Sequence, residues 1–259
     1  MMTPSEEAKY TDKVLSEIVP APSDLLEEWL LLLHEPIRRQ LKQLRRFTTL
    51  LREGKKWRLE QFLQWFSESV GVFMDRALAL EKVLFDTWMS CTPLTTLYKQ
   101  PYRDRYNDVL ERLTKLMDAA KRFRQRPFEE SLTETCEALD LLIPYTEKHI
   151  DEMEKLSIDP VGGAKCLYSL SDQEFLMKEY LHKWMKLEDA RILLPAVLDT
   201  AGYWMTAHGV NVLRSRMTSY TLFMNDCFWA PAYRKKNGRY YDLLADVPKE
   251  AKSCWGLCC

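Results

Sequence analysis

Residues 59–88, LEQFLQWFSESVGVFMDRALALEKVLFDTW, carry apolar side chains spaced by threes and fours over about eight turns of helix. This spacing places the apolar side chains on one face of a long helix and predicts that the face packs against a core. The side chains on that face are Leu59, Phe62, Leu63, Phe66, Val70, Phe73, Ala77, Leu80, Leu84 and Trp88. Because so long an apolar face must be covered, we expect further helices on either side of it in the sequence.

The preceding segment, residues 24–54, predicts a first long helix. Asp24 lies directly before the apolar run and is suited to cap the free N–H groups of the first turn. Gly54 supplies the stop, because glycine readily adopts the left-handed conformation that ends many helices. Pro36 lies inside the segment and removes one backbone hydrogen bond, so we expect a kink just before it or a fresh start at Glu35.

Two more helical patterns follow. We expect a loop that contains Pro93 and Pro101, then a third helix over residues 106–123 and a fourth over residues 132–153, with a kink at Pro144. Four long amphipathic helices with short connections predict an all-α fold, an up-down-up-down four-helix bundle.

This pattern divides the chain into four parts. We expect an N-terminal tail over residues 1–23, the four-helix bundle over 24–156, a helical and aromatic extension over 157–248, and a cysteine-rich tail over 249–259. The many Trp and Tyr side chains of the extension would be exposed if it stood alone, so we expect it to pack on the bundle.

One helix of the extension is predicted by its flanking residues. Ser171 and Glu174 match a capping box, and the helix that follows is expected to end at Leu194, directly before Pro195. After Gly202 the sequence is aromatic, rich in methionine and broken by turn residues.

Composition excludes several classes of protein. Only 8 of the 259 residues are Gly, which disfavours glycine-rich phosphate loops and turn-rich β folds. Lys and Arg number 37 against 38 for Asp and Glu, so the chain lacks the positive charge on which nucleic-acid binding depends, and we expect no nucleic-acid partner. The motifs of the common hydrolases, kinases and dehydrogenases are absent from the sequence.

The sequence also predicts a location in the cell. The first residues, MMTPSEEAKY, lack the apolar core of a secretory signal, and no stretch approaches the about 20 apolar residues of a membrane-spanning helix. The 7 Cys are an odd number with no CxxC pair, which argues against a disulfide framework and against a zinc site. We therefore expect a cytoplasmic protein.

Three polar residues lie where the pattern predicts a core. The chain has only 4 His, of which His34 follows the apolar run WLLLL and His149 lies in the fourth predicted helix. Glu81 shares the apolar face of the second helix with Ala77 and Leu84. A buried carboxylate needs a partner, and a cation is one option.

At these residues the sequence resembles the hemerythrin-like family, the HHE cation-binding four-helix bundles. The resemblance rests on HEPIRR at 34–39, on FLQWFSES and ALEKVLFDTW within 62–88, and on LIPYTEKHIDEMEKL at 142–156. In addition, LLPAVLD at 193–199 and FWAPAYRKKNGRYYDLL at 228–244 are similar to the extension of fungal members.

The resemblance implies a set of metal ligands. The family places a His in the first helix, matched by His34, and a His-x-x-x-Glu in the second, whose carboxylate is matched by Glu81. In the fourth helix it places a His and then a carboxylate, matched by His149 and Glu154. Imidazoles and carboxylates at facing positions of a bundle suit iron.

The sequence departs from the family at the remaining ligand positions. Ala77 replaces the His of the second helix, Tyr106 and Leu110 replace both His of the third, and Met153 fills the nearer carboxylate position of the fourth. Because too few donors remain for a di-iron centre, we expect a mononuclear iron site at most and favour a bundle without metal.

Three functions stay open on this basis. The favoured hypothesis is a binding or scaffold protein with a degenerate iron site, whose protein partner the sequence does not identify. The second is a non-haem iron protein that binds oxygen or performs oxidative chemistry with His34, Glu81 and His149 as ligands. The third is a bundle interior reused as an apolar pocket for a small molecule.

The last residues, SCWGLCC at 253–259, suggest membrane association. Cys258 and Cys259 resemble the geranylgeranylated ends of Rab-type small GTPases, and the basic residues at 234–236 supply a second, electrostatic signal. The alternatives are an unmodified tail with reactive thiols or a redox pair of Cys254 and Cys258.

Overall fold

The computed structural model of the chain describes residues 25–90, 95–158 and 186–244. Every regular element in these ranges is a helix, which confirms the all-α prediction. None of the helices in the described ranges is long and apolar enough to cross a membrane.

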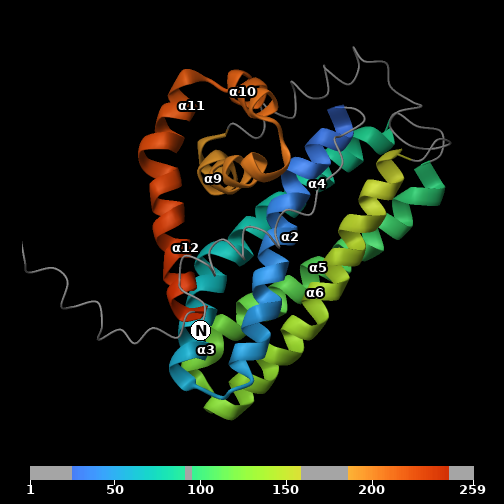
Figure 1. Ribbon diagram of the computed structural model, residues 1–259. Helices are drawn as coiled ribbons and strands as arrows, with labels where there is room; N and C mark the ends of the chain where they lie inside the picture. Colours follow the sequence, from blue (N-terminus) through green and yellow to red (C-terminus); the bar gives the residue numbers. More distant parts are fainter. Residues whose placement is uncertain (1–24, 91–94, 159–185, 245–259) are drawn as a thin grey trace, which may run out of the picture.

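Four long helical stretches lie side by side, and successive stretches run in alternate directions (Figure 1). The last two stretches pack along each other, the last also packs along the first, and the second packs against the third. The stretches are α2 (Leu25–Leu51); α3 (Lys56–Trp65), η1 (Phe66–Val70) and α4 (Gly71–Ser90); α5 (Thr95–Arg122) with a 3₁₀ turn, η2 (Phe123–Gln125); and α6 (Phe128–Ile158).

The core is formed by the apolar face predicted for the second stretch. The predicted side chains from Leu59 to Leu84 are all buried, and the side chain of Trp88 lies outside the described ones. Buried side chains of α2, among them Trp29 and Phe47, cover this face together with residues of α5 and α6. The helical spacing therefore identifies this part of the core correctly.

The predicted end of the first helix at Gly54 is also confirmed. Gly54 has a φ of 73°, in the left-handed region that glycine occupies without strain, and its N–H donates to the carbonyl of Leu51 at 2.9 Å. The predicted cap at Asp24 lies outside the described residues.

Proline interrupts fewer helices than the sequence predicts. Pro36 and Pro144 lie inside unbroken helices, so no helix starts afresh at Glu35. Pro101, expected in a loop, lies inside α5. Pro195, expected to follow a helix end, lies inside α9 (Leu187–Trp204). The fresh start at Glu35, the loop at Pro101 and the helix end before Pro195 were therefore wrong, because burial of the flanking side chains offsets the one hydrogen bond that each proline removes. Pro144 lies inside a helix as predicted, and the kinks at Pro36 and Pro144 stay predictions.

Two helical stretches contain a π-helical segment. The first is η1, between α3 and α4, and the second is η3 (Asn225–Trp229), which leads into α12 (Ala230–Leu244). Each segment accommodates an extra residue in one wide turn, and such segments are frequent at functional sites.

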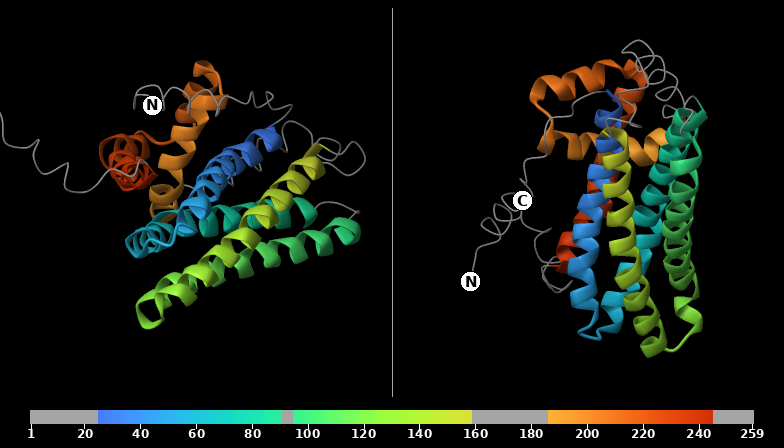
Figure 2. Two further views of the ribbon diagram at one scale, coloured as in Figure 1. Left: turned by 60° about the horizontal axis from the view of Figure 1, so that its bottom comes forward. Right: turned by 90° about the vertical axis from the view of Figure 1, so that its right-hand side faces the viewer.

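The C-terminal helices pack against the first and second stretches. Helix α9 contacts α2 and α4, and α12 runs back to contact α3 (Figure 2). Between them lie α10 (Ala207–Ser215) and α11 (Ser219–Met224). Burial of the aromatic side chains is incomplete: Trp229 is buried, whereas Tyr203, Tyr220, Phe223 and Phe228 are exposed. The predicted capping box at Ser171 lies outside the described residues.

Candidate functional site

The four residues predicted as metal ligands meet in one buried cluster. His34 comes from α2, Glu81 from α4, and His149 and Glu154 from α6. The exposed fractions of His34, Glu81 and His149 are 0%, 1% and 0%. The described structure therefore brings together all four residues at which the sequence matches the hemerythrin-like pattern.

His34 contacts a carboxylate through each ring nitrogen. Its Nε2 lies 3.2 Å from Glu81 Oε2 and its Nδ1 lies 2.9 Å from Glu154 Oε1. An ionised carboxylate only accepts hydrogen bonds, so both ring nitrogens donate and the ring is an imidazolium. Burial alone lowers the pKa of His34, but the hydrogen bonds and charges of Glu154 and Glu81 outweigh burial and raise this pKa to about 9.

Glu81 joins the two histidines. Its Oε1 accepts a hydrogen bond from His149 Nε2 at 2.8 Å, while its Oε2 faces His34. Burial raises the pKa of Glu81, but the charge of His149 and the hydrogen bonds to both histidines outweigh it and hold the pKa well below its ordinary value. Glu81 is therefore an ionised carboxylate inside the core.

Arg38 connects the cluster to the surface. Its two terminal nitrogens donate to Glu154 at 2.8 and 2.7 Å, and further bonds reach Glu35 at 2.8 Å and Asp151 at 3.1 Å. Burial raises the pKa of Glu154, but the hydrogen bonds to His34 and Arg38 lower it overall. The sequence analysis missed Arg38, although its position four residues after His34 on one helix face was an available signal.

Tyr102 is a second residue that the sequence analysis missed. It is fully buried, its ring stacks on Phe85 with centroids 3.5 Å apart, and it lies 5.7 Å from the ring of His149. Burial and the negative charge of Glu81 raise the pKa of its hydroxyl, so Tyr102 is neutral. Tyr102 was missed because the sequence predicts a loop around Pro101, whereas the structure places Tyr102 in helix α5, which packs beside the cluster.

The cluster, as arranged, does not fit a metal ion. Both nitrogens of His34 carry protons that bond carboxylates, so this imidazole offers no lone pair to a metal. In the residues that the structure describes, no group of three or more His, Cys, Asp or Glu side chains is arranged to hold a metal ion. Ala77, Met153 and Tyr106, which stand where the resemblance implies further ligands, are buried in the core.

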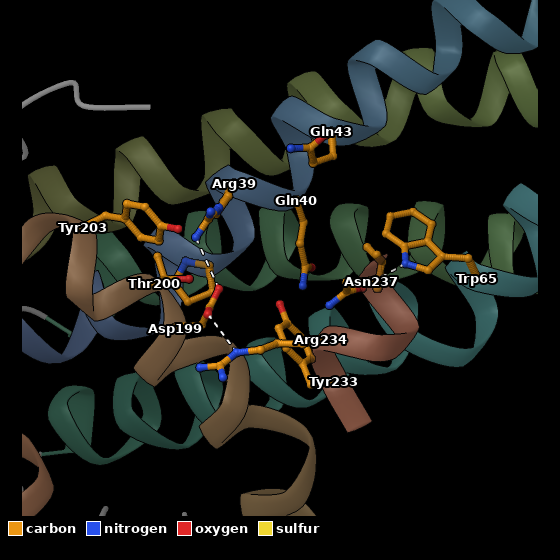
Figure 3. Close-up of a pocket in the computed structure, with 12 residues that line it drawn as sticks. Arg39, Gln40, Gln43, Trp65, Asp199, Thr200, Tyr203, Tyr233, Arg234 and Asn237 are labelled. Carbon is orange, nitrogen blue, oxygen red and sulfur yellow. Dashed lines mark hydrogen bonds and ion pairs between the residues drawn. The ribbon is translucent and has the colours of Figure 1, made fainter. Parts of the chain in front are cut away.

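A separate pocket lies between the four stretches and the C-terminal helices. It has a volume of about 240 Å³ and is outside the interior in which we expected an apolar cavity. Figure 3 shows Arg39, Asp199 and Arg234 at one end and Trp65 at the other, with Gln40 pointing between them. The lining residues are Pro36, Arg39, Gln40, Gln43, Trp65, Val70, Asp199, Thr200, Tyr203, Tyr233, Arg234 and Asn237.

Ion pairs and an aromatic contact order one end of this pocket. Asp199 lies 3.5 Å from Arg39 and 3.7 Å from Arg234, so it links α2 to α12. The guanidinium of Arg39 also lies over the ring of Tyr203, 4.0 Å from its centroid. At the other end, Trp65 Nε1 donates to Asn237 Oδ1 at 3.0 Å.

Comparisons with known proteins add no relative. The chain matches no protein-family model, no curated protein and no solved structure.

Proposed function

We propose that this chain is a hemerythrin-like, up-down-up-down four-helix bundle whose metal site has become a buried network of ion pairs, and that it works as a binding or scaffold protein. The fold part of the proposal is supported by the alternating directions of the four long stretches. It is also supported by the meeting of His34, Glu81, His149 and Glu154, which match the family pattern on three different helices.

One observation carries the functional part: His34 donates to carboxylates from both ring nitrogens. In a metal site the imidazole gives a lone pair to the metal and donates only its other N–H to a carboxylate or carbonyl. Here the second nitrogen is used by Glu81, so protons occupy the positions that a cation would need.

The charges of the network support the same proposal. Arg38 and protonated His34 supply positive charge to the ionised carboxylates Glu81 and Glu154, and the charge of His149 also faces Glu81. Because each carboxylate bonds a cationic partner, the core contains an ionised cluster that is compensated from within. Such a cluster holds three helices in register, which is a structural task rather than a catalytic one.

Metal analysis of the full chain tests this function. We expect protein purified without chelator, and then incubated with ferrous iron, to contain far less than one iron per chain. His149→Ala should leave that iron content unchanged and should destabilise the fold by about 2–3 kcal/mol, because Glu81 loses its shortest hydrogen bond. The measurements are elemental mass spectrometry and urea unfolding followed by circular dichroism.

The competing function is a mononuclear iron protein with His34, Glu81 and His149 as ligands. It requires near-stoichiometric iron that His149→Ala abolishes, and that result would overturn the proposal. His208→Ala is the matched control, because His208 is an exposed histidine on another helix.

Peripheral membrane association is the remaining part of the proposal. Cys258 and Cys259 lie outside the described residues, but the basic side chains Lys235 and Lys236 on α12 are exposed and can face an anionic surface. In eukaryotic cells, Cys258→Ser with Cys259→Ser should shift the protein from the membrane pellet to the supernatant. Cys227→Ser, at an exposed cysteine, should not change the distribution, and an unchanged distribution of the double variant would refute lipidation.

A further inference from the structure

The pocket between α2, η1, α9 and α12 has the composition of a binding site. Its volume of about 240 Å³ lies just below the usual range of about 300–1,000 Å³ for drug-sized ligands, so it has room for a small molecule. One π-helical segment contributes to its lining, because Val70 is the last residue of η1.

Two buried carboxamide oxygens in the lining lack hydrogen-bond partners. Gln40 and Gln43 lie one turn apart on α2, each with an exposed fraction of 9%, and neither side-chain oxygen has a partner. Buried amides are nearly always hydrogen-bonded in folded proteins. Because Gln40 points into the pocket in Figure 3, a polar group of a ligand is the missing partner that its position favours.

The charged side chains that line the pocket favour an anionic ligand. Arg39 and Arg234 contribute two guanidinium groups, and Asp199 contributes the one carboxylate between them, which leaves one excess positive charge. Guanidinium groups bind carboxylates through paired N–H donors. A carboxylate of the ligand therefore belongs at this end of the pocket.

The other end of the pocket favours a flat ring. Trp65 lies at this end, Tyr233 lies between it and the arginine end in Figure 3, and the Trp65 ring is oriented by its hydrogen bond to Asn237. Aromatic side chains of this kind pack well on the face or edge of another ring.

We propose that this pocket binds a small aromatic carboxylate, with its carboxylate at Arg39 and Arg234, its ring beside Trp65 and Tyr233, and a polar ring substituent at Gln40. The site is separate from the buried histidine cluster, so this inference goes beyond the proposed function and does not depend on the metal analysis.

The test is isothermal titration calorimetry of the full chain with three probes. 4-Hydroxybenzoate carries both polar groups, benzoate lacks the hydroxyl, and methyl 4-hydroxybenzoate lacks the charge. We expect 4-hydroxybenzoate to bind with a Kd below about 1 mM, and each of the other probes to bind about tenfold more weakly.

Two variants locate the binding site. Arg234→Gln should weaken 4-hydroxybenzoate about tenfold, whereas the control Lys235→Gln removes a charge from the neighbouring position, outside the lining, and should change the Kd less than about twofold. Gln40→Leu should abolish the preference for 4-hydroxybenzoate over benzoate. Its thermal unfolding midpoint should not fall, because it removes a buried amide whose oxygen has no partner.

Either of two results would overturn the proposal. One is the absence of saturable binding of both carboxylates to the wild-type chain. The other is binding that Arg234→Gln and Gln40→Leu leave unchanged, because the probes would then bind elsewhere. A loss of the hydroxyl preference in Gln40→Leu alone, with unchanged stability, supports the proposed orientation.

Discussion

Replacing Glu81 by Ala should lower the free energy of unfolding by about 3–5 kcal/mol, the largest effect that we expect from any single change in the buried cluster. Glu81 is the one carboxylate that bonds both His34 and His149, and all three side chains are almost fully buried. Without it, the histidines retain the cost of burial and lose the negative charge that compensates them. Urea unfolding followed by circular dichroism measures the change.

Two further variants separate the charge from the shape of Glu81. Glu81→Gln keeps the volume and one acceptor, so it should cost less than Glu81→Ala. Glu111→Ala on α5 is the matched control, because Glu111 is exposed and pairs with Lys115 on the surface; it should change stability far less than Glu81→Ala does. A Glu81→Ala protein as stable as this control would contradict the ion-pair network.

Raising the pH from 6.5 to 9 should lower the free energy of unfolding by about 3 kcal/mol through His34 alone. The pKa of His34 rises from its ordinary 6.5 to about 9 in the folded chain, so the folded state holds this proton more tightly than the unfolded state. The stabilisation is therefore fully present below pH 6.5 and is lost as the pH rises through 9. The physical source is the pair of carboxylates at its ring nitrogens, which outweighs burial.

The measurement is urea unfolding at a series of pH values between 6 and 9.5. His34→Gln should lose most of the dependence on pH, whereas His208→Gln, at the exposed histidine of α10, should keep it. A wild-type stability that stays constant between pH 6.5 and 9 would show that His34 is not held as an imidazolium.

The sequence was sufficient for the parts of the fold that depend on local pattern. The apolar face from Leu59 to Leu84 and the stop at Gly54 follow from helical spacing and from the conformational freedom of glycine, and both are confirmed. Pro101 and Pro195 misled the analysis, because the pattern reveals the hydrogen bond that a proline removes but not the packing that offsets it. The spacing of apolar residues does not predict the π-helical segments.

The candidate sites were predictable to different degrees. His34, Glu81, His149 and Glu154 were identified because a polar residue on an apolar face, supported by a family resemblance, marks a buried cluster. The pocket was not predictable, because its lining comes from helices far apart in the sequence. Gln40 and Gln43 have the appearance of ordinary surface residues of a helix until α9 and α12 cover them.

The wide turn at η1 determines which changes in chain length the buried cluster tolerates. A residue added to or removed from an α-helix rotates everything beyond it by about 100° relative to what precedes it. Because the wide turn absorbs one extra residue, loss of one residue within Phe66–Val70 would convert it to ordinary α-helix and leave Glu81 facing the histidines. Loss of one residue between Gly71 and Glu81 would instead rotate Glu81 away from the histidines, so the position of a deletion along this stretch decides whether the buried cluster survives.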